Sequence, residues 1–201
     1  MFTNKNNLKN KIFYARLALM QAQRSLGNTK QNPSVGCVIV KNSSIVGTGF
    51  TSLGGTPHAE VNAIKAAKKN VSNSDLFVTL EPCSHYGKTP PCTNYIIKNK
   101  IRKVFFSIND PDSRSFNKSS KKLRKNGIYV NKGAFRKEIN FFYRSYLKSK
   151  KKNLPFVTSK LAISKDFYTI KKNNKWITNE FSRGRVHLLR SYHDCIMTSS
   201  E

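Results

Sequence analysis

The feature that most constrains the fold of this 201-residue chain is a set of metal-ligating side chains in its middle. His58 and Glu60 stand two positions apart, and the thiols of Cys83 and Cys92 follow downstream. Catalytic zinc sites use three protein ligands and leave a fourth position for water, whereas structural sites close with four. We therefore expect a fold that brings His58, Cys83 and Cys92 together beside the carboxylate of Glu60, as a hydrolytic zinc centre requires.

The spacing of the two cysteines argues against a structural zinc finger. Such fingers pair cysteines two to four residues apart, whereas eight residues separate Cys83 from Cys92. An alternative in which His58 caps a helix and the cysteines merely pack explains each residue singly but not their joint order. The other two cysteines, Cys37 and Cys195, stand in apolar runs and are interpreted as core residues, so we expect no disulfide framework.

Short apolar runs alternate with helical patterns along most of the chain. This alternation predicts an α/β layer sandwich. We expect strands at 35–40, 45–50, 76–80, within 101–108 and at 128–130, with a turn at 41–44, and helices at 12–26, 58–69, 92–100, 119–126 and 134–146.

A charged stretch at residues 148–154 is the predicted linker between two domains. Residues 1–147 would form the first domain and residues 155–201 the beginning of a second. In the second we expect strands at 155–162 and 195–198 and a helix at 182–191. Because one β-α-β unit cannot cover both faces of a sheet, this second domain is expected to be incomplete.

The composition is strongly basic, with a formal net charge of +27 and a pI near 10.2. An anionic partner such as RNA, DNA or a phosphorylated metabolite would suit this charge. The charge is diffuse, however, and a Lys/Asn-biased composition explains it without any partner. No apolar stretch approaches the roughly 20 residues that cross a bilayer, and the N-terminus lacks an apolar signal core. These features favour a cytoplasmic protein with no membrane partner.

The order His58-Ala59-Glu60, Pro82-Cys83 and a later cysteine resembles the zinc-dependent cytidine-deaminase superfamily. The segment 79–92, TLEPCSHYGKTPPC, is more specific and resembles the deaminase domain of the bifunctional riboflavin-biosynthesis (RibD) family, as do segments 32–40 and 57–63. Further matches at 160–162, 176–178, 188–190 and 198–200 resemble the opening of that family's reductase domain. The resemblance implies a three-layer α/β/α cytidine-deaminase-like sandwich, followed by the first elements of an incomplete α/β reductase domain.

The resemblance also implies a reaction. The family hydrolyses 2,5-diamino-6-(5-phosphoribosylamino)pyrimidin-4(3H)-one to 5-amino-6-(5-phosphoribosylamino)uracil, with loss of ammonia. His58, Cys83 and Cys92 would hold Zn²⁺. Glu60 would take a proton from the attacking water and return protons to the ring nitrogen and the departing amine.

Other matching positions would bind the phosphoribosylated pyrimidine. Asp112 stands where the family usually has Asn, so an ionised carboxylate replaces a side chain that can donate hydrogen bonds. The turn that contains it also has a complete structural explanation. The candidate substrate-binding residues are Asn32, His85, Lys88, Thr89, Asp110 and Asp112.

In the family, the reductase domain reduces the ribose of the deaminated product with NADPH. Ala162, Trp176 and Arg190 match positions that meet the cofactor or the substrate there. The segment 166–168, Asp-Phe-Tyr, departs from the family's usual Asp-Gly-Arg/Lys. Because most of the cofactor fold would lie beyond residue 201, we expect no reduction by the chain as given.

Two rival functions follow from the same residues. A tRNA adenosine deaminase or other nucleic-acid deaminase would suit the basic charge, but those enzymes show Pro-Cys-x-x-Cys. The longer loop between Cys83 and Cys92 instead favours a single phosphoribosyl ligand, with no specific nucleic acid as partner. A basic RNA-binding protein without activity is the third interpretation, and the superfamily resemblance leaves a homo-oligomer open.

Overall fold

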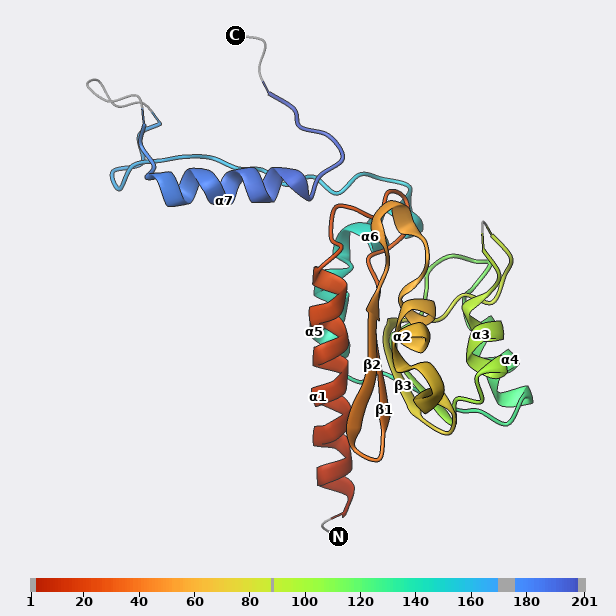
Figure 1. The fold of residues 1–201 in the computed structure, drawn as a ribbon. Helices are drawn as coiled ribbons and strands as arrows, with labels where there is room; N and C mark the ends of the chain where they lie inside the picture. The colour runs from red at the N-terminus through yellow and green to blue at the C-terminus, as the bar shows by residue number, and fades with distance from the viewer. Residues whose placement is uncertain (1–2, 88, 170–175, 199–201) are drawn as a thin grey trace. The chain divides into compact units, whose positions relative to one another are not determined.

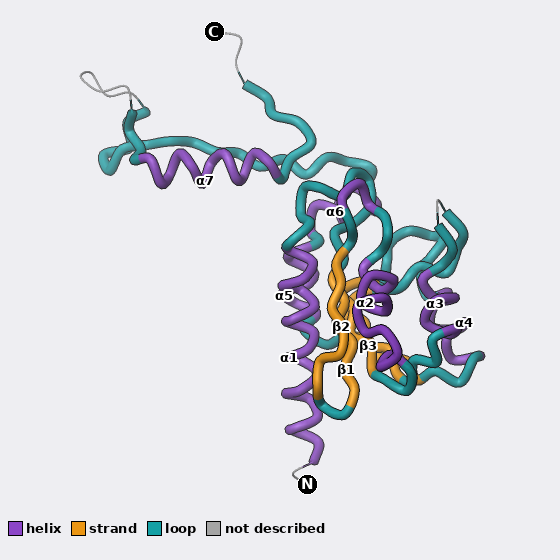
Figure 2. The backbone as a smooth tube through the Cα atoms, in the orientation of Figure 1, coloured by secondary structure: helices purple, strands orange, loops and turns teal. Residues whose placement is uncertain are grey.

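The computed structural model describes residues 3–87, 89–169 and 176–198 (Figures 1 and 2). The chain divides into two compact units, Met1–Pro155 and Phe156–Glu201. The first unit contains a five-stranded sheet and the candidate site. No helix in the described ranges is long and apolar enough to cross a membrane.

The sheet of the first unit has the strand order β2-β1-β3-β4-β5. Strand β1 pairs antiparallel with both β2 and β3, whereas β3, β4 and β5 run parallel. The carboxyl ends of β3 and β4 therefore meet at one edge of the sheet, and the loops that follow them carry site residues. The strands are β1 Gly36–Lys41, β2 Ser44–Phe50, β3 Asp75–Leu80, β4 Lys103–Ile108 and β5 Tyr129–Lys132.

The hairpin between β1 and β2 turns at the predicted position. Asn42 and Ser43 have φ values of 49° and 63°. Positive φ at both central residues is typical of the two-residue turns whose twist matches that of paired strands. The predicted turn at 41–44 is confirmed.

Helices cover both faces of the sheet, which confirms the three-layer α/β/α architecture. Figure 1 shows α1 (Thr3–Gln23) and α5 (Arg136–Phe142) on one face. On the other face lie α2 (Ala59–Ala67), α3 (Cys92–Lys98) and α4 (Lys118–Lys125). Each strand residue therefore points either toward the α1 layer or toward the α2 layer.

The alternation of side chains along the central strands explains the two-sided core. Val38 and Val40 pack with Ala18 in the layer of α1, whereas Cys37 and Ile39 pack toward α2. Cys37 is fully buried, which confirms its interpretation as a core residue. In the α1 layer, the rings of Phe77 and Phe105 stack with centroids 4.6 Å apart.

The predicted helix at 134–146 is wrong as a single element. It is two helices, α5 and α6 (Arg144–Lys152), which meet at Tyr143. The Tyr143 ring is buried, and its hydroxyl lies 2.7 Å from Thr79 Oγ1 and donates to the carbonyl of Ser34 at 2.8 Å. These contacts anchor Tyr143, at the junction of the two helices, to β3 and to the segment before β1. Residues 148–152 of the predicted linker complete α6.

The second unit contains helix α7 (Glu180–Ser191), which confirms the predicted helix at 182–191. The Asn179 side chain caps it by accepting a hydrogen bond from the Ser182 amide at 2.9 Å. The strands predicted at 155–162 and 195–198 are wrong, because both segments are irregular. A strand needs a neighbour for its backbone hydrogen bonds, and the described part of this unit supplies none. Cys195 is exposed, so its interpretation as a core residue is also wrong.

Candidate active site

Three elements bring the predicted metal ligands together. His58 is the N-cap of α2, Cys83 lies in the loop after β3, and Cys92 is the first residue of α3. The ligand atoms of the three residues all lie within 4.8 Å of one another. His58 Nδ1 is 3.3 Å from Cys92 Sγ and 3.6 Å from Cys83 Sγ.

These distances match the ligand set of a zinc ion. Zn–S bonds of about 2.3 Å and Zn–N bonds of about 2.0–2.1 Å at tetrahedral angles place nitrogen and sulfur roughly 3.5 Å apart. Two thiolates and one neutral imidazole would neutralise the charge of Zn²⁺. One nitrogen and two sulfur donors leave one tetrahedral position open, as a catalytic site needs. The donor set of His58, Cys83 and Cys92 therefore fits the ion.

The electrostatics of the cluster favour a thiolate at Cys83. A hydrogen bond from the Cys92 thiol lowers the pKa of Cys83 to about 4, and the same interaction raises the pKa of Cys92. The backbone N–H of Cys92, at the start of α3, also donates to Cys83 Sγ at 3.2 Å. The hydrogen bond to Cys83 raises the pKa of His58. Thiolates are the form that binds metal.

Glu60 lies in the first turn of α2, two residues after His58. Its side chain is only 3% exposed, and burial raises its pKa. Glu60 lines the same pocket as His58 and Cys83. A buried carboxyl group beside metal ligands is suited to accept a proton and return it.

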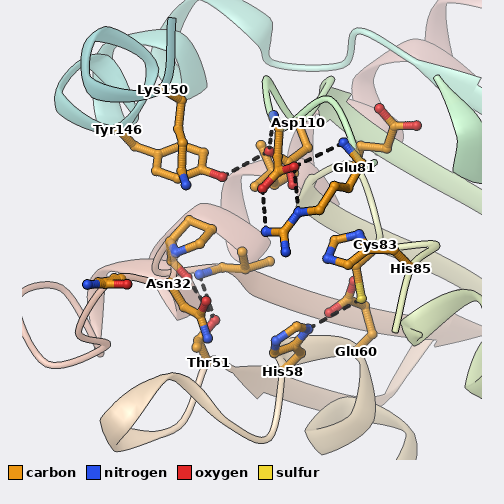
Figure 3. A pocket seen from close by; sticks show the side chains of 16 residues that line it. Asn32, Thr51, His58, Glu60, Glu81, Cys83, His85, Asp110, Tyr146 and Lys150 are labelled. Carbon is orange, nitrogen blue, oxygen red and sulfur yellow. Dashed lines mark hydrogen bonds and ion pairs between the residues drawn. The ribbon is translucent and has the colours of Figure 1, made fainter. Parts of the chain in front are cut away.

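One pocket collects most of the predicted site residues (Figure 3). Cys92 belongs to the metal cluster but is 1% exposed and is not among the lining residues. Thr89 is described but is not among the lining residues, and Lys88 lies outside the described residues. The predicted residues that line the pocket are Asn32, His58, Glu60, Cys83, His85, Asp110 and Asp112.

Asn32 is held at the pocket by a close approach of the backbone. Its side-chain amide donates to the carbonyl of Gly55 at 2.9 Å. Gly55 has a φ of +94°, and a Cβ there would lie 2.7 Å from Asn32 Nδ2. The bond uses one amide hydrogen, so Asn32 retains a donor and an acceptor for a ligand.

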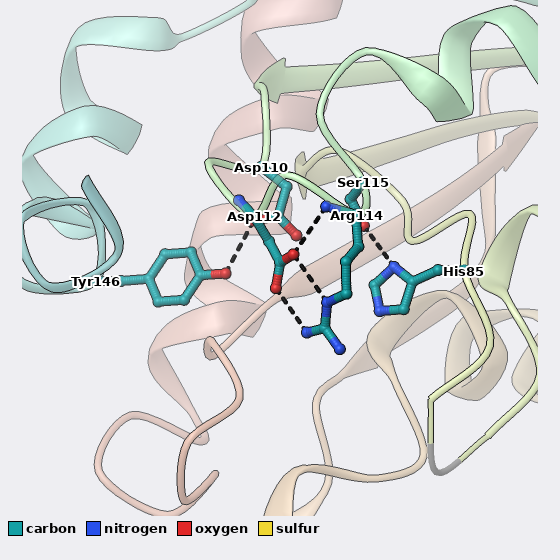
Figure 4. A network of polar contacts seen from close by, with 6 residues as sticks. All are labelled: His85, Asp110, Asp112, Arg114, Ser115 and Tyr146. Carbon is teal, nitrogen blue, oxygen red and sulfur yellow. Dashed lines mark hydrogen bonds and ion pairs between the residues drawn. The ribbon is translucent and has the colours of Figure 1, made fainter. Parts of the chain in front are cut away.

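The turn after β4 carries a second polar cluster (Figure 4). The Tyr146 hydroxyl donates to Asp110 Oδ1 at 2.9 Å, and the Asp112 amide donates to the same oxygen at 3.0 Å. Burial raises the pKa of Asp110. Arg114 forms a paired contact with Asp112 and holds the pKa of that carboxyl well below its usual range. His85 Nδ1 lies 3.0 Å from Ser115 Oγ, which ties its loop to this turn.

Sequence reasoning missed several residues of this pocket. Arg114 could have been noticed as a cation two residues beyond Asp112. Tyr146 and Lys150 share one face of α6 through their spacing of four, but the prediction ended that helix at Tyr146. Glu81 also lines the pocket and accepts hydrogen bonds from Asn109, Asn117 and Ser119.

The residues matched to the reductase domain lie in the second unit. These residues are Ala162, Trp176 and Arg190. The Trp176 ring is 52% exposed and has the Arg183 guanidinium 4.8 Å from its centroid. None of the three is among the residues that line the described pocket.

The fold, the His/Cys/Cys cluster and the buried glutamate define a zinc-dependent deaminase class. The chain belongs to the family of the cytidine and deoxycytidylate deaminase zinc-binding region, whose model matches residues 8–108.

Within this class the chain is a homologue of riboflavin biosynthesis proteins. It is 40% identical to riboflavin biosynthesis protein RibD of Bacillus amyloliquefaciens over 94% of this chain and 51% of the relative. It is 38% identical to RibD of Escherichia coli K12 over 94% of this chain and 52% of the relative. The solved structure of Acinetobacter baumannii RibD matches with a TM-score of 0.84 at 35% identity, over 92% of this chain and 52% of that one. The chain thus spans about half the length of these relatives.

Proposed function

We propose that the chain hydrolyses 2,5-diamino-6-(5-phosphoribosylamino)pyrimidin-4(3H)-one to 5-amino-6-(5-phosphoribosylamino)uracil. In this reaction a C–O bond forms at the ring carbon, the C–N bond to the exocyclic amine breaks, and ammonia leaves. One observation carries the proposal. The pocket that contains Glu60 and the metal ligands His58 and Cys83 also contains the polar turn of residues 110–114. The names of the chain's RibD relatives support riboflavin biosynthesis as the pathway to which this reaction belongs.

The residues would divide the chemistry among them. A zinc ion on His58, Cys83 and Cys92 would lower the pKa of a water at its fourth position to about 7. Glu60 would accept a proton from the attacking water and deliver protons to the ring nitrogen and the leaving amine. Asn32 would offer its remaining donor and acceptor to the pyrimidine edge.

Substrate binding involves the remaining predicted residues. His85, Lys88 and Thr89 would meet the sugar phosphate, since imidazole, ammonium and hydroxyl groups all suit phosphate oxygens. Asp110 is shielded from water and holds the turn through Tyr146, so it would shape the ribose end of the pocket.

We assign residues 1–147 to the deaminase domain and 155–201 to a reductase-type segment. Residues 148–154 join them, and the first five of these complete helix α6. NADPH and the roles of Ala162, Trp176 and Arg190 belong to that second activity. The described residues of the second unit contain one helix and no strand, so they do not by themselves form the sheet that such a cofactor fold needs. A homo-oligomer in the cytoplasm remains part of the proposal.

Ammonia release separates this function from its rivals. The purified zinc-loaded protein should deaminate the phosphoribosylaminopyrimidine, while cytidine and tRNA remain unchanged. Conversion of adenosine to inosine in tRNA, with no turnover of the pyrimidine, would overturn the assignment in favour of a nucleic-acid deaminase. Weak, salt-sensitive tRNA binding would not, because so basic a protein binds polyanions without specificity.

A further inference from the structure

An arginine and an aspartate at the pocket form a paired contact that the sequence pattern did not reveal (Figure 4). Arg114 Nε donates to Asp112 Oδ1 at 2.9 Å, and Arg114 Nη2 donates to Asp112 Oδ2 at 2.7 Å. The backbone N–H of Arg114 also donates to Asp112 Oδ1, at 3.0 Å. The two side-chain bonds fix the plane of the guanidinium relative to the carboxylate, and the backbone bond holds the carboxylate in place.

This arrangement leaves part of the guanidinium available. Of its five N–H groups, two are directed at Asp112 through Nε and Nη2. In the described ranges, the hydrogen bonds of the Arg114 side chain come from Nε and Nη2 and none comes from Nη1. The Arg114 side chain is 60% exposed, whereas that of Asp112 is 13% exposed. The outer edge of the guanidinium is therefore open to a ligand in the pocket.

The charges around the pocket explain why an anionic ligand needs such a group. Glu81, Asp110 and Asp112 line it together and would repel a phosphate. Among the described lining residues, Arg114 and Lys150 are the only lysine or arginine side chains. Arg114 thus offsets Asp112 and keeps outward-facing donors, and a guanidinium fork matches the oxygens of a phosphate monoester.

We infer that Arg114, oriented by Asp112, binds the phosphate of the substrate and makes the pocket specific for the phosphorylated ribosylaminopyrimidine. Asp112 is the positioning residue, and Arg114 is the specificity residue. The inference rests on the proposed function and deepens it. Asp112 and Arg114 together then form one recognition unit.

The first experiment compares the phosphorylated substrate with its dephosphorylated form in kinetic measurements of wild type, Arg114→Ala and Arg114→Lys. Hydrogen bonds to charged groups support a rise in KM of about 10- to 100-fold for Arg114→Ala with the phosphorylated substrate. We expect kcat, and both parameters for the dephosphorylated substrate, to stay within about threefold of wild type. The KM of Arg114→Lys for the phosphorylated substrate should lie between those of wild type and Arg114→Ala, because lysine keeps the charge without the two-pronged guanidinium.

Arg102→Ala is the matched control. Two nitrogens of Arg102 also donate to a carboxylate, at 3.1 and 2.9 Å from Asp75 Oδ1. Arg102 is not among the residues that line the pocket. Its variant should leave KM unchanged for both substrates. An equal KM rise in Arg102→Ala and Arg114→Ala would overturn the inference, because a general loss of surface charge would then explain the effect.

The double variant Asp112→Asn/Arg114→Gln tests whether Arg114 only neutralises Asp112. If neutralisation were its sole role, the double variant would recover the wild-type KM, and the inference would be wrong. Phosphate recognition predicts that KM stays high. If wild type turns over the substrate and Arg114→Ala has an unchanged KM, the role inferred for Arg114 is wrong, whereas the proposed function stands.

A calorimetric titration separates failure of the inference from failure of the proposed function. Absence of wild-type turnover would contradict the function. Binding of the phosphorylated uracil product requires no turnover, and Arg114→Ala should weaken it about 10- to 100-fold. Inorganic phosphate is the parallel probe for a site that recognises phosphate alone. Equal affinity of wild type and Arg114→Ala for the product would reject the role of Arg114 whatever the activity.

Discussion

The two ends of the pocket are built in different ways. At the metal end, Cys92 and Glu60 are 1% and 3% exposed, and they project from the first turns of two packed helices. At the other end, the Arg114 side chain is 60% exposed and belongs to a turn after β4. The groups that carry out the chemistry are therefore held in place by the core, whereas the groups that recognise the substrate are held by local hydrogen bonds. Changes at the first end should alter kcat, and changes at the second should alter KM.

The largest effect is expected from loss of a metal ligand. Cys83→Ser should remove most of the bound zinc and lower kcat by on the order of 10³-fold or more, because the open-site water is no longer acidified. Elemental analysis and ammonia release measure both quantities. Cys195→Ser, at an exposed cysteine of the second unit, should leave zinc content and rate unchanged. A fully active, zinc-free Cys83→Ser protein would remove the basis of the comparison.

A substitution in the sheet should disturb the metal end of the pocket, because the sheet packs against the helix that carries two of its residues. A Cβ at Gly49 would lie 2.4 Å from both the Ala59 carbonyl oxygen and the Ala63 amide nitrogen of α2. Gly49→Ala should therefore lower the free energy of unfolding by about 3 kcal/mol and disturb His58 and Glu60 on that helix. Gly184→Ala on α7 is the control, since its Cβ would meet no atom within 4 Å. Urea unfolding checks both, and equal stability of the two variants would show that this helix can shift freely.

The smallest effect should come from acid at the exposed end. Arg114 depresses the folded-state pKa of Asp112, so the ion pair stabilises the fold above the ordinary aspartate pKa of about 3.9. This contribution is lost as the pH falls through the lower folded value. Because Arg114 is largely exposed, the contribution should stay under about 1 kcal/mol. Urea unfolding between pH 5 and the acid limit should show a slightly flatter pH dependence in Asp112→Asn; a steeper one would contradict the sign.

The sequence predicted the metal end better than the other end. The order of His58, Cys83 and Cys92 carries its own chemical requirement, and the strand and helix periods around them are regular. The contact between Asp112 and Arg114 depends on the conformation of one turn, which no periodicity reports. The break between α5 and α6 at Tyr143 was also missed, because the contacts that hold Tyr143 there reach Thr79 and Ser34, which are distant in the sequence.

The second unit illustrates a different limit of prediction. Apolar runs at 155–162 and 195–198 have strand-like composition, yet neither forms a strand. Strand formation depends on a paired neighbour as much as on local propensity. The helix at Glu180–Ser191 was predictable because its hydrogen bonds are internal and Asn179 caps it.

Two buried glutamates of the same pocket provide the most direct test of whether Glu60 transfers the proton. Glu60 and Glu81 are both 3% exposed, but Glu81 accepts hydrogen bonds from Asn109, Asn117 and Ser119 and thereby anchors the loop after β4. Glu60→Gln should lower kcat for ammonia release about 10²- to 10⁴-fold with zinc retained, since the proton acceptor is lost.

Glu81→Gln should lower thermal stability and leave kcat within about tenfold of wild type, because a hydrogen-bonded anchor is weakened and no proton-transfer group is removed. The decisive measurement is the ammonia-release rate of the zinc-loaded, folded Glu60→Gln protein beside Glu81→Gln. A near-wild-type rate in Glu60→Gln would contradict the proton-transfer role of Glu60.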